Sequence, residues 1–200
     1  MKKHRLWLLA VLLIMAVAGT IASRAQDTKA LRPPKGAKVA IVVFEDMQCP
    51  DCARAHPLVE EAARTYKIPV VRYDFPLPQH EWSMEAAVIA RYFEKKSKKL
   101  GHDFRTEVFK HQQEITKQNL RPFAEKFAAA RKVDLPVFVD PQGKLAAEII
   151  AERDFGQRIG ITHTPTLYVV SNRTSGTPFV EVVDRSNLFQ LIDEMKREAR

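Results

Sequence analysis

The chain has 200 residues, of which 46% are hydrophobic and 28% charged, and it contains only two cysteines. This composition is typical of a globular domain with a sizeable core and excludes disordered chains, disulfide scaffolds and zinc sites closed by four thiolates. The 32 basic and 24 acidic residues give a formal charge of +8. Four of the cations lie in the leader described next, and without them 28 basic and 24 acidic residues leave a balance of only +4. We therefore expect no nucleic-acid partner.

Residues 1–25 have the pattern of a secretory signal peptide. A basic start is followed by an uncharged apolar run, Leu6 to Ala18, and by small residues that fit a cleavage site at Ala22 or Ala25. The apolar stretch is just short of the roughly 20 residues that a spanning helix needs, so an uncleaved signal-anchor is the alternative. In either case the basic end stays in the cytoplasm and the rest is exported. This predicts a periplasmic or other extracytoplasmic protein, tethered to the inner membrane if the leader is retained.

A short tether and a β-α-β unit are predicted next. Residues 26–37 are polar and contain two prolines and a glycine, which indicates a tether before a domain over residues 38–200. The apolar, β-branched run up to Phe44 predicts a strand buried on both faces. A helical pattern then extends to about residue 66, with Pro50 at its first position, where the missing N–H is not needed. A second β-rich run over 68–75 completes the unit.

The second half of the chain begins with helical periodicity. Apolar residues recur at helical spacing through most of an inserted segment, about 79–158. Strand patterns return at 166–170 and 179–183, and Ser186 can cap a last helix. The order of these elements predicts an α/β fold with a helical insertion.

The two cysteines, Cys49 and Cys52, lie three residues apart at the start of the first predicted helix. The positive end of a helix dipole favours a thiolate, so the pKa of Cys49 should be low. Cys52 lies nearly one turn further in, where it can close a short, easily reduced disulfide while shielded from most attackers. We expect Cys49 to form mixed disulfides and Cys52 to resolve them.

A second motif lies more than a hundred residues further on. Pro165 stands at the very start of a predicted strand, a position typical of a cis X–Pro bond. Such a bond would turn the backbone of Thr164 toward the thiols, where it could bind an extended substrate. Thr164 and Pro165 are therefore the candidate substrate-binding residues.

Together these motifs resemble the DsbA-like branch of the thioredoxin superfamily. The resemblance is carried by Phe44-Glu45-Asp46-Met47-Gln48-Cys49-Pro50-Asp51-Cys52, Tyr73-Asp74-Phe75-Pro76-Leu77-Pro78 and Gly160-Ile161-Thr162-His163-Thr164-Pro165-Thr166. It implies a thioredoxin fold, with a central mixed β-sheet flanked by helices and an inserted helical domain. It also implies an enzyme without a cofactor that acts on protein thiols and disulfides outside the cytoplasm, with Cys49 and Cys52 as the reacting pair.

The match to the strongly oxidising members is incomplete at the residues that tune the thiols. Asp51 stands where those members carry a histidine, and an anion there opposes the thiolate. Many thioredoxin-type enzymes carry a buried carboxylate six residues before the first cysteine, a position that is Val43 in this chain. The carboxylate of Glu45 is nearer to Cys49 in sequence. With Pro50, Asp51 and Glu45 as tuning residues, we hypothesise a milder oxidant.

The direction of electron flow stays open in the sequence. We favour a dithiol oxidase recharged by a membrane redox partner over a reductase or an isomerase, because no dimerisation segment is visible and we expect a monomer. Two other classes remain as alternatives. Cys49, Cys52 and His56, with His163, could bind zinc or copper, although we predict no metal, and the fold could serve as a non-catalytic holdase.

Overall fold

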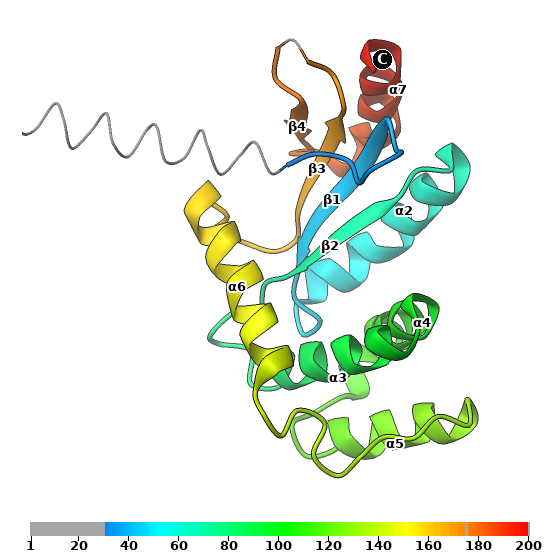
Figure 1. Ribbon diagram of the computed structural model, residues 1–200, viewed down its shortest axis with the longest axis vertical. Helices are drawn as coiled ribbons and strands as arrows, with labels where there is room; N and C mark the ends of the chain where they lie inside the picture. The colour runs from blue at the N-terminus through cyan, green and yellow to red at the C-terminus, as the bar shows by residue number, and fades with distance from the viewer. Residues whose placement is uncertain (1–30, 175, 200) are drawn as a thin grey trace, which may run out of the picture.

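The computed structural model describes residues 31–174 and 176–199 (Figure 1). The predicted leader lies outside the described residues. The elements are, in chain order, β1 (Val39–Glu45), α2 (Pro50–Tyr66), β2 (Val70–Asp74), α3 (Ser83–Lys96), α4 (Lys98–Lys110), the 3-10 turn η1 (Gln112–Glu114), α5 (Leu120–Ala130), α6 (Lys144–Ile159), β3 (Thr166–Ser171), β4 (Phe179–Glu181), the 3-10 turn η2 (Arg185–Asn187) and α7 (Leu188–Glu198). None of the helices within these ranges is both long and apolar enough to cross a membrane.

The four strands form one mixed sheet in the order β2-β1-β3-β4. β1 pairs in parallel with β2 and antiparallel with β3, and β4 pairs antiparallel with β3. All seven residues of β1 are buried, as its continuous apolar run predicted. The predicted α/β fold, a mixed sheet flanked by helices, is confirmed.

Helices cover both faces of the sheet because successive side chains of a strand point to opposite sides. On one face, Ile41 and Val43 pack with residues of α2 and α7. On the other face, Val42 and Phe44 pack with α6. Fully burying an aliphatic side chain of this kind stabilises the fold by about 1.5–3 kcal/mol.

The helices between β2 and β3 build a core of their own. Phe93 of α3, Phe104 of α4 and Phe127 of α5 meet with each pair of ring centroids 5.1 Å apart. α6 belongs to both parts of the molecule, since its first half buries Ile149 in this helical core and its second half packs Phe155 against the sheet. Figure 1 shows α6 running from the helical insertion upward alongside the sheet.

α6 can approach the sheet closely because it carries a glycine at the contact. A Cβ built on Gly156 would lie only 2.7 Å from the ring of Phe75 and 3.2 Å from that of Phe44. Any larger residue would therefore push α6 away from the sheet or displace these rings.

The described end of the predicted tether packs against the fold. Leu31 is 1% exposed and lies in the core between the sheet and α6. The guanidinium of Arg32 donates to the backbone carbonyl of Arg173 at 2.7 Å. Residues 31 and 32 are thus anchored on the sheet.

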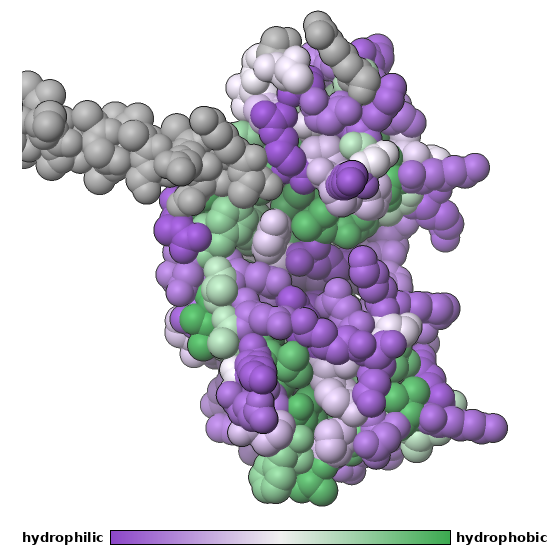
Figure 2. Space-filling model, viewed as in Figure 1, coloured by the Kyte–Doolittle hydropathy of each residue, from purple (hydrophilic) through white to green (hydrophobic). Residues whose placement is uncertain are grey.

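Among the described residues, the large apolar side chains that are exposed lie in three places: Val137 and Phe138 between α5 and α6, Ile150 on α6, and Val183 just before η2. Figure 2 shows a largely hydrophilic face with apolar residues in several places, one group of them at its lower end. Val183, the most exposed of these residues at 88%, lies two residues before Arg185, which binds Asp51 between the cysteines, so exposed apolar surface is not confined to the end away from the thiols.

Candidate redox site

The two cysteines lie at the N-terminal end of α2, where the sheet meets the helical insertion. Cys49 is the N-cap residue and Pro50 occupies the first helical position, as predicted. Cys49 is 7% exposed and Cys52 only 2%, and both are free thiols in this structure. Cys49, Cys52 and Met47 close one side of the core of the insertion. The outer sulfur is therefore the one that a substrate can reach.

Each sulfur has a distinct backbone partner. The Sγ of Cys49 lies 3.2 Å from the carbonyl oxygen of Thr164, to which it donates when the thiol is protonated. The Sγ of Cys52 accepts from the backbone N–H of Asp46 at 3.4 Å. Thr164 thus lies directly against the outer sulfur, although it is 115 residues further along the chain.

The environment drives the pKa values of the two thiols apart. The hydrogen bond from the Cys52 thiol is the main cause that lowers the pKa of Cys49 from 9.0 to about 5, against the opposing effect of burial. The backbone N–H groups of Cys52 and Asp51 lower it further, as does the Thr164 hydroxyl, which can donate to the thiolate. Burial strongly raises the pKa of Cys52. At neutral pH the reduced pair therefore holds one thiolate, on Cys49, and one proton, on Cys52.

The peptide bond between Thr164 and Pro165 is cis. It immediately precedes β3, the strand that pairs with β1. Thr164 is 7% exposed, and its hydroxyl oxygen is buried with no hydrogen-bond partner among the described residues. This hydroxyl is free to donate to a Cys49 thiolate, in keeping with its effect on the Cys49 pKa.

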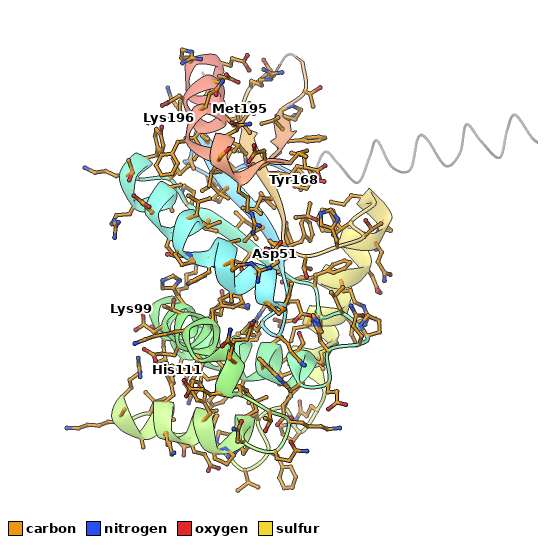
Figure 3. All side chains as sticks on the ribbon, turned by 180° about the vertical axis from the view of Figure 1, so that it is seen from behind. Asp51, Lys99, His111, Tyr168, Met195 and Lys196 are labelled. Carbon is orange, nitrogen blue, oxygen red and sulfur yellow. The ribbon has the colours of Figure 1, made fainter. Side chains whose placement is uncertain are left out.

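Asp51, between the two cysteines, is held by two arginines. Arg185 of η2 donates to the Asp51 carboxylate at 2.8 Å and to its backbone carbonyl at 3.2 Å. Arg54 lies 3.1 Å from the same carboxylate. The hydrogen bond from Arg185 is the main cause that lowers the pKa of Asp51. Figure 3 shows Asp51 at the N-terminal end of α2, beside the junction with the helical insertion.

Glu45 lies at the end of β1, beneath the thiols, but it is already paired. Its carboxylate accepts from Arg72 at 2.6 Å and from Arg105 at 3.4 Å, and the residue is only 4% exposed. Arg105 also binds Asp74 at 2.6 Å, which ties α4 to the ends of two strands. The Glu45 charge is a minor cause of the raised Cys52 pKa. Its main contacts therefore join the insertion to the sheet.

Two residues that contact the thiol turn carried no signal in the sequence. Gln112 of η1 is buried, and its side-chain amide donates to the carbonyls of Met47 at 2.7 Å and Cys49 at 3.0 Å. Arg185 reaches Asp51 from the other end of the chain. A lone Gln or Arg far from the motif gives no periodicity or spacing that would mark it, so only the fold reveals them.

The alternative metal ligands do not gather around the thiols. His56 is buried against Phe109, with its Nε2 3.0 Å from the hydroxyl of Thr106. Over residues 31–174 and 176–199, no group of three or more His, Cys, Asp or Glu residues is arranged to hold a metal ion.

Known structures share this architecture. The chain is similar to alpha-DsbA1 of Wolbachia pipientis, with 18% identity and a TM-score of 0.68 over 84% of this chain and 95% of that one. It resembles the thiol-disulfide exchange protein alpha-DsbA2 of the same organism, with 19% identity and a TM-score of 0.68 over 89% and 96%. The catalytic domain of Proteus mirabilis ScsC aligns with 20% identity and a TM-score of 0.66 over 87% and 97%. At sequence identities this low, the structural matches establish a shared fold and no more.

A family model provides the sequence-level evidence. No curated protein sequence matches the chain significantly. The Thioredoxin_4 model, described as thioredoxin, matches residues 33–184, which cover both cysteines and Pro165. The Cys49–Cys52 pair fits the redox-active Cys-x-x-Cys site of thiol:disulfide oxidoreductases with this fold. The predicted resemblance is therefore confirmed: the chain belongs to this thioredoxin family, with a DsbA-like fold.

Proposed function

We propose that the protein is an extracytoplasmic thiol:disulfide oxidoreductase that works as a dithiol oxidase on protein substrates. The observation that carries this proposal is the position of Cys49 at the start of α2, between the deeply buried Cys52 and Thr164 of the cis-proline loop, an environment that lowers the pKa of Cys49 to about 5. A Cys49 thiolate that is stabilised in the reduced protein makes the corresponding disulfide a stronger oxidant. The hypothesis of a milder oxidant rested on the Asp51 anion at the position where strongly oxidising members carry a histidine, and the two arginines on Asp51 weaken that argument.

The reaction uses the two sulfurs in turn. A substrate thiolate attacks the Sγ of Cys49, the Cys49–Cys52 bond breaks, and Cys52 leaves and takes up a proton, which its raised pKa favours. A second substrate thiolate then attacks the substrate sulfur of the mixed disulfide and releases the Cys49 thiolate. The substrate loses two electrons, and the protein gains them as a reduced pair. The low Cys49 pKa makes this sulfur a good leaving group in the second step.

Recharging needs an external oxidant. We propose that a membrane redox partner accepts the two electrons and restores the Cys49–Cys52 disulfide, and that the chain acts as a monomer. The leader pattern supports export to the periplasm, by way of a signal peptide or a retained signal-anchor over residues 1–25. Thr164 and Pro165 would bind the backbone of the substrate beside Cys49, because the Thr164 carbonyl already faces that sulfur at 3.2 Å.

Trapping tests the proposed chemistry. With Cys52→Ser, mixed disulfides with substrate proteins should accumulate through Cys49, whereas the matched Cys49→Ser variant should trap none. Failure of Cys52→Ser to form any mixed disulfide would favour a binding module. The direction of electron flow is tested by the redox state of the wild-type pair in cells, since an oxidase is kept mostly oxidised and a reductase or isomerase mostly reduced.

A further inference from the structure

A groove of about 480 Å³ opens beside the outer thiol, on the face of the sheet that α6 covers. One wall is the connection from β2 to α3, residues 75–79, and the other is the loop that leads into β3, residues 161–164. Arg153 and Gln157 of α6 line the groove between these walls. Thr164 lines the groove, and its carbonyl oxygen lies 3.2 Å from the Sγ of Cys49, so the groove is continuous with the redox site.

The first wall is held in place by a buried carboxylate. Asp46 is 1% exposed, and its side chain accepts from the backbone N–H of Leu77 at 2.7 Å and lies 2.8 Å from the Nδ1 of His80. The close approach of Gly156 to Phe75 sets the position of α6 along the same wall. The groove is therefore built by packed elements on both sides.

The ionisable residues that line the groove are basic. None of its lining residues is acidic, whereas Arg153 and His163 are basic. The nearest carboxylate to Arg153 is that of its neighbour Asp154, at the long distance of 4.0 Å, and the Nε of Arg153 is buried with no hydrogen-bond partner among the described residues. Arg91, by contrast, is paired with both Asp74 and Glu152 at 2.8 Å. The Arg153 side chain is 30% exposed, and its terminal N–H groups make no hydrogen bond within the part of the chain that the structure describes, so they can donate to a ligand in the groove.

The other lining residues are largely apolar. Pro76, Leu77 and Pro78 present aliphatic surface on one wall, and Ile161 does so on the other. A bound segment would place apolar side chains between these walls and an acidic group against Arg153, since guanidinium–carboxylate hydrogen bonds are among the strongest available in a partly wet groove.

We propose that this groove binds the stretch of a protein-thiol substrate next to its reacting cysteine and selects stretches that combine apolar and acidic side chains. The proposal rests on the proposed function and names the substrate class of that same site. The substrate cysteine lies at Cys49, its backbone passes Thr164, and an Asp or Glu side chain pairs with Arg153.

Matched peptides test this selection. The oxidised protein is mixed with reduced dithiol peptides that are identical except for Glu, Gln or Lys beside one cysteine, and the second-order rate constant of peptide oxidation is measured. The Glu peptide should react about five-fold faster than the Lys peptide at low salt, as expected for one exposed ion pair. Added salt should shrink this ratio.

Variants separate the groove from the general charge of the protein. Arg153→Gln should bring the Glu-to-Lys rate ratio close to one, and Arg153→Lys should keep most of it. Arg64→Gln removes the same charge from an exposed position in the last turn of α2 and should leave the ratio unchanged.

Two results would overturn the selection while leaving the proposed function intact. One is equal rates for the Glu and Lys peptides with the wild-type protein, and the other is an equal loss of preference in Arg64→Gln and Arg153→Gln. Oxidation of none of the peptides, nor of a small dithiol, would instead remove the proposed function.

Discussion

The guanidinium of Arg185 holds both the side chain and the backbone carbonyl of Asp51, although 134 residues separate them in the chain. Asp51 lies between the two cysteines, where an unpaired anion would oppose a thiolate on Cys49. The pairing offsets that anion and ties η2 to the first turn of α2. Asp51 itself lowers the Cys49 pKa through its backbone N–H, so a Cys-Pro-Asp-Cys sequence is compatible with a Cys49 pKa of about 5.

Arg185→Gln should make the protein a weaker oxidant. The substitution removes one of the two cations that pair with the Asp51 carboxylate. The negative charge near the thiolate is then less neutralised, so the pKa of Cys49 should rise from about 5. We expect the equilibrium constant with glutathione to shift about three-fold to ten-fold toward the disulfide, about 1 kcal/mol for a partly exposed pair. The measurements are a glutathione titration and the ultraviolet absorbance of the thiolate against pH.

The cause is checked in a second background. In Asp51→Asn, the same Arg185→Gln change should have little effect, because no anion remains to be compensated. An equal effect in both backgrounds would show that Arg185 acts without Asp51.

Reduction should give the protein a pH-dependent stability that the oxidised form lacks. The pKa of Cys49 is lowered from 9.0 to about 5 on folding. An unfolded chain therefore holds this proton over a pH range in which the folded chain has released it, so the free energy of unfolding rises with pH between about 5 and 9. The gain is at most about 5 kcal/mol, and it is lost as the pH falls through 5.

Urea denaturation of the reduced and oxidised forms at several pH values measures this effect. Above pH 9 the curve for the reduced form should turn down, because the raised pKa keeps Cys52 protonated only in the folded chain. The same pH dependence in the oxidised form, which has no free thiol, would assign the effect to other groups.

Thr164→Val should raise the pKa of Cys49 while preserving the shape of the loop. The Thr164 side chain contributes to the lowered Cys49 pKa, and valine replaces its hydroxyl with a methyl group of similar size. The thiolate absorbance should therefore appear at a higher pH than in the wild type. Thr162→Val, a change at an exposed position of the same loop, is the control and should leave the pKa of Cys49 unchanged. Identical titrations for wild type and Thr164→Val would mean that the hydroxyl has no effect.

Gln112→Ala should destabilise the junction between the insertion and the thiol turn. It removes the donor that serves the carbonyls of Met47 and Cys49 in a buried site. Leaving such groups unpaired costs about 1–3 kcal/mol. Chemical denaturation measures the loss, with Gln113→Ala at the exposed neighbouring position as the control. Equal stability of the two variants would contradict a bridging role for Gln112.

The local parts of this protein could be predicted because their causes are local. A continuous β-branched run gives a buried central strand, and β1 has all of its residues buried. The helix start at Pro50 and the position of Cys49 as its N-cap follow from the lack of an N–H on proline. The pairing of a Cys-x-x-Cys motif with a distant Thr-Pro was enough to indicate the family.

The tertiary structure decided which charged and amide side chains contact each other across long stretches of chain. Arg185 on Asp51, Gln112 on the thiol turn and Arg105 between Glu45 and Asp74 each join residues that no helical or strand period relates. The same limit applied to Glu45, whose place in the sequence suggested tuning of the thiols but whose side chain is paired with two arginines.

The sequence by itself determined that two cysteines form a pair at a helix start, because backbone propensity and the helix dipole act over a few residues. Only the tertiary structure decided which charges surround that pair. An ion pair depends on the spatial meeting of two long side chains, and the position of each is set by the packing of the elements that carry them. The charge next to Cys49 is thus a property of the fold as much as of the Cys-Pro-Asp-Cys motif.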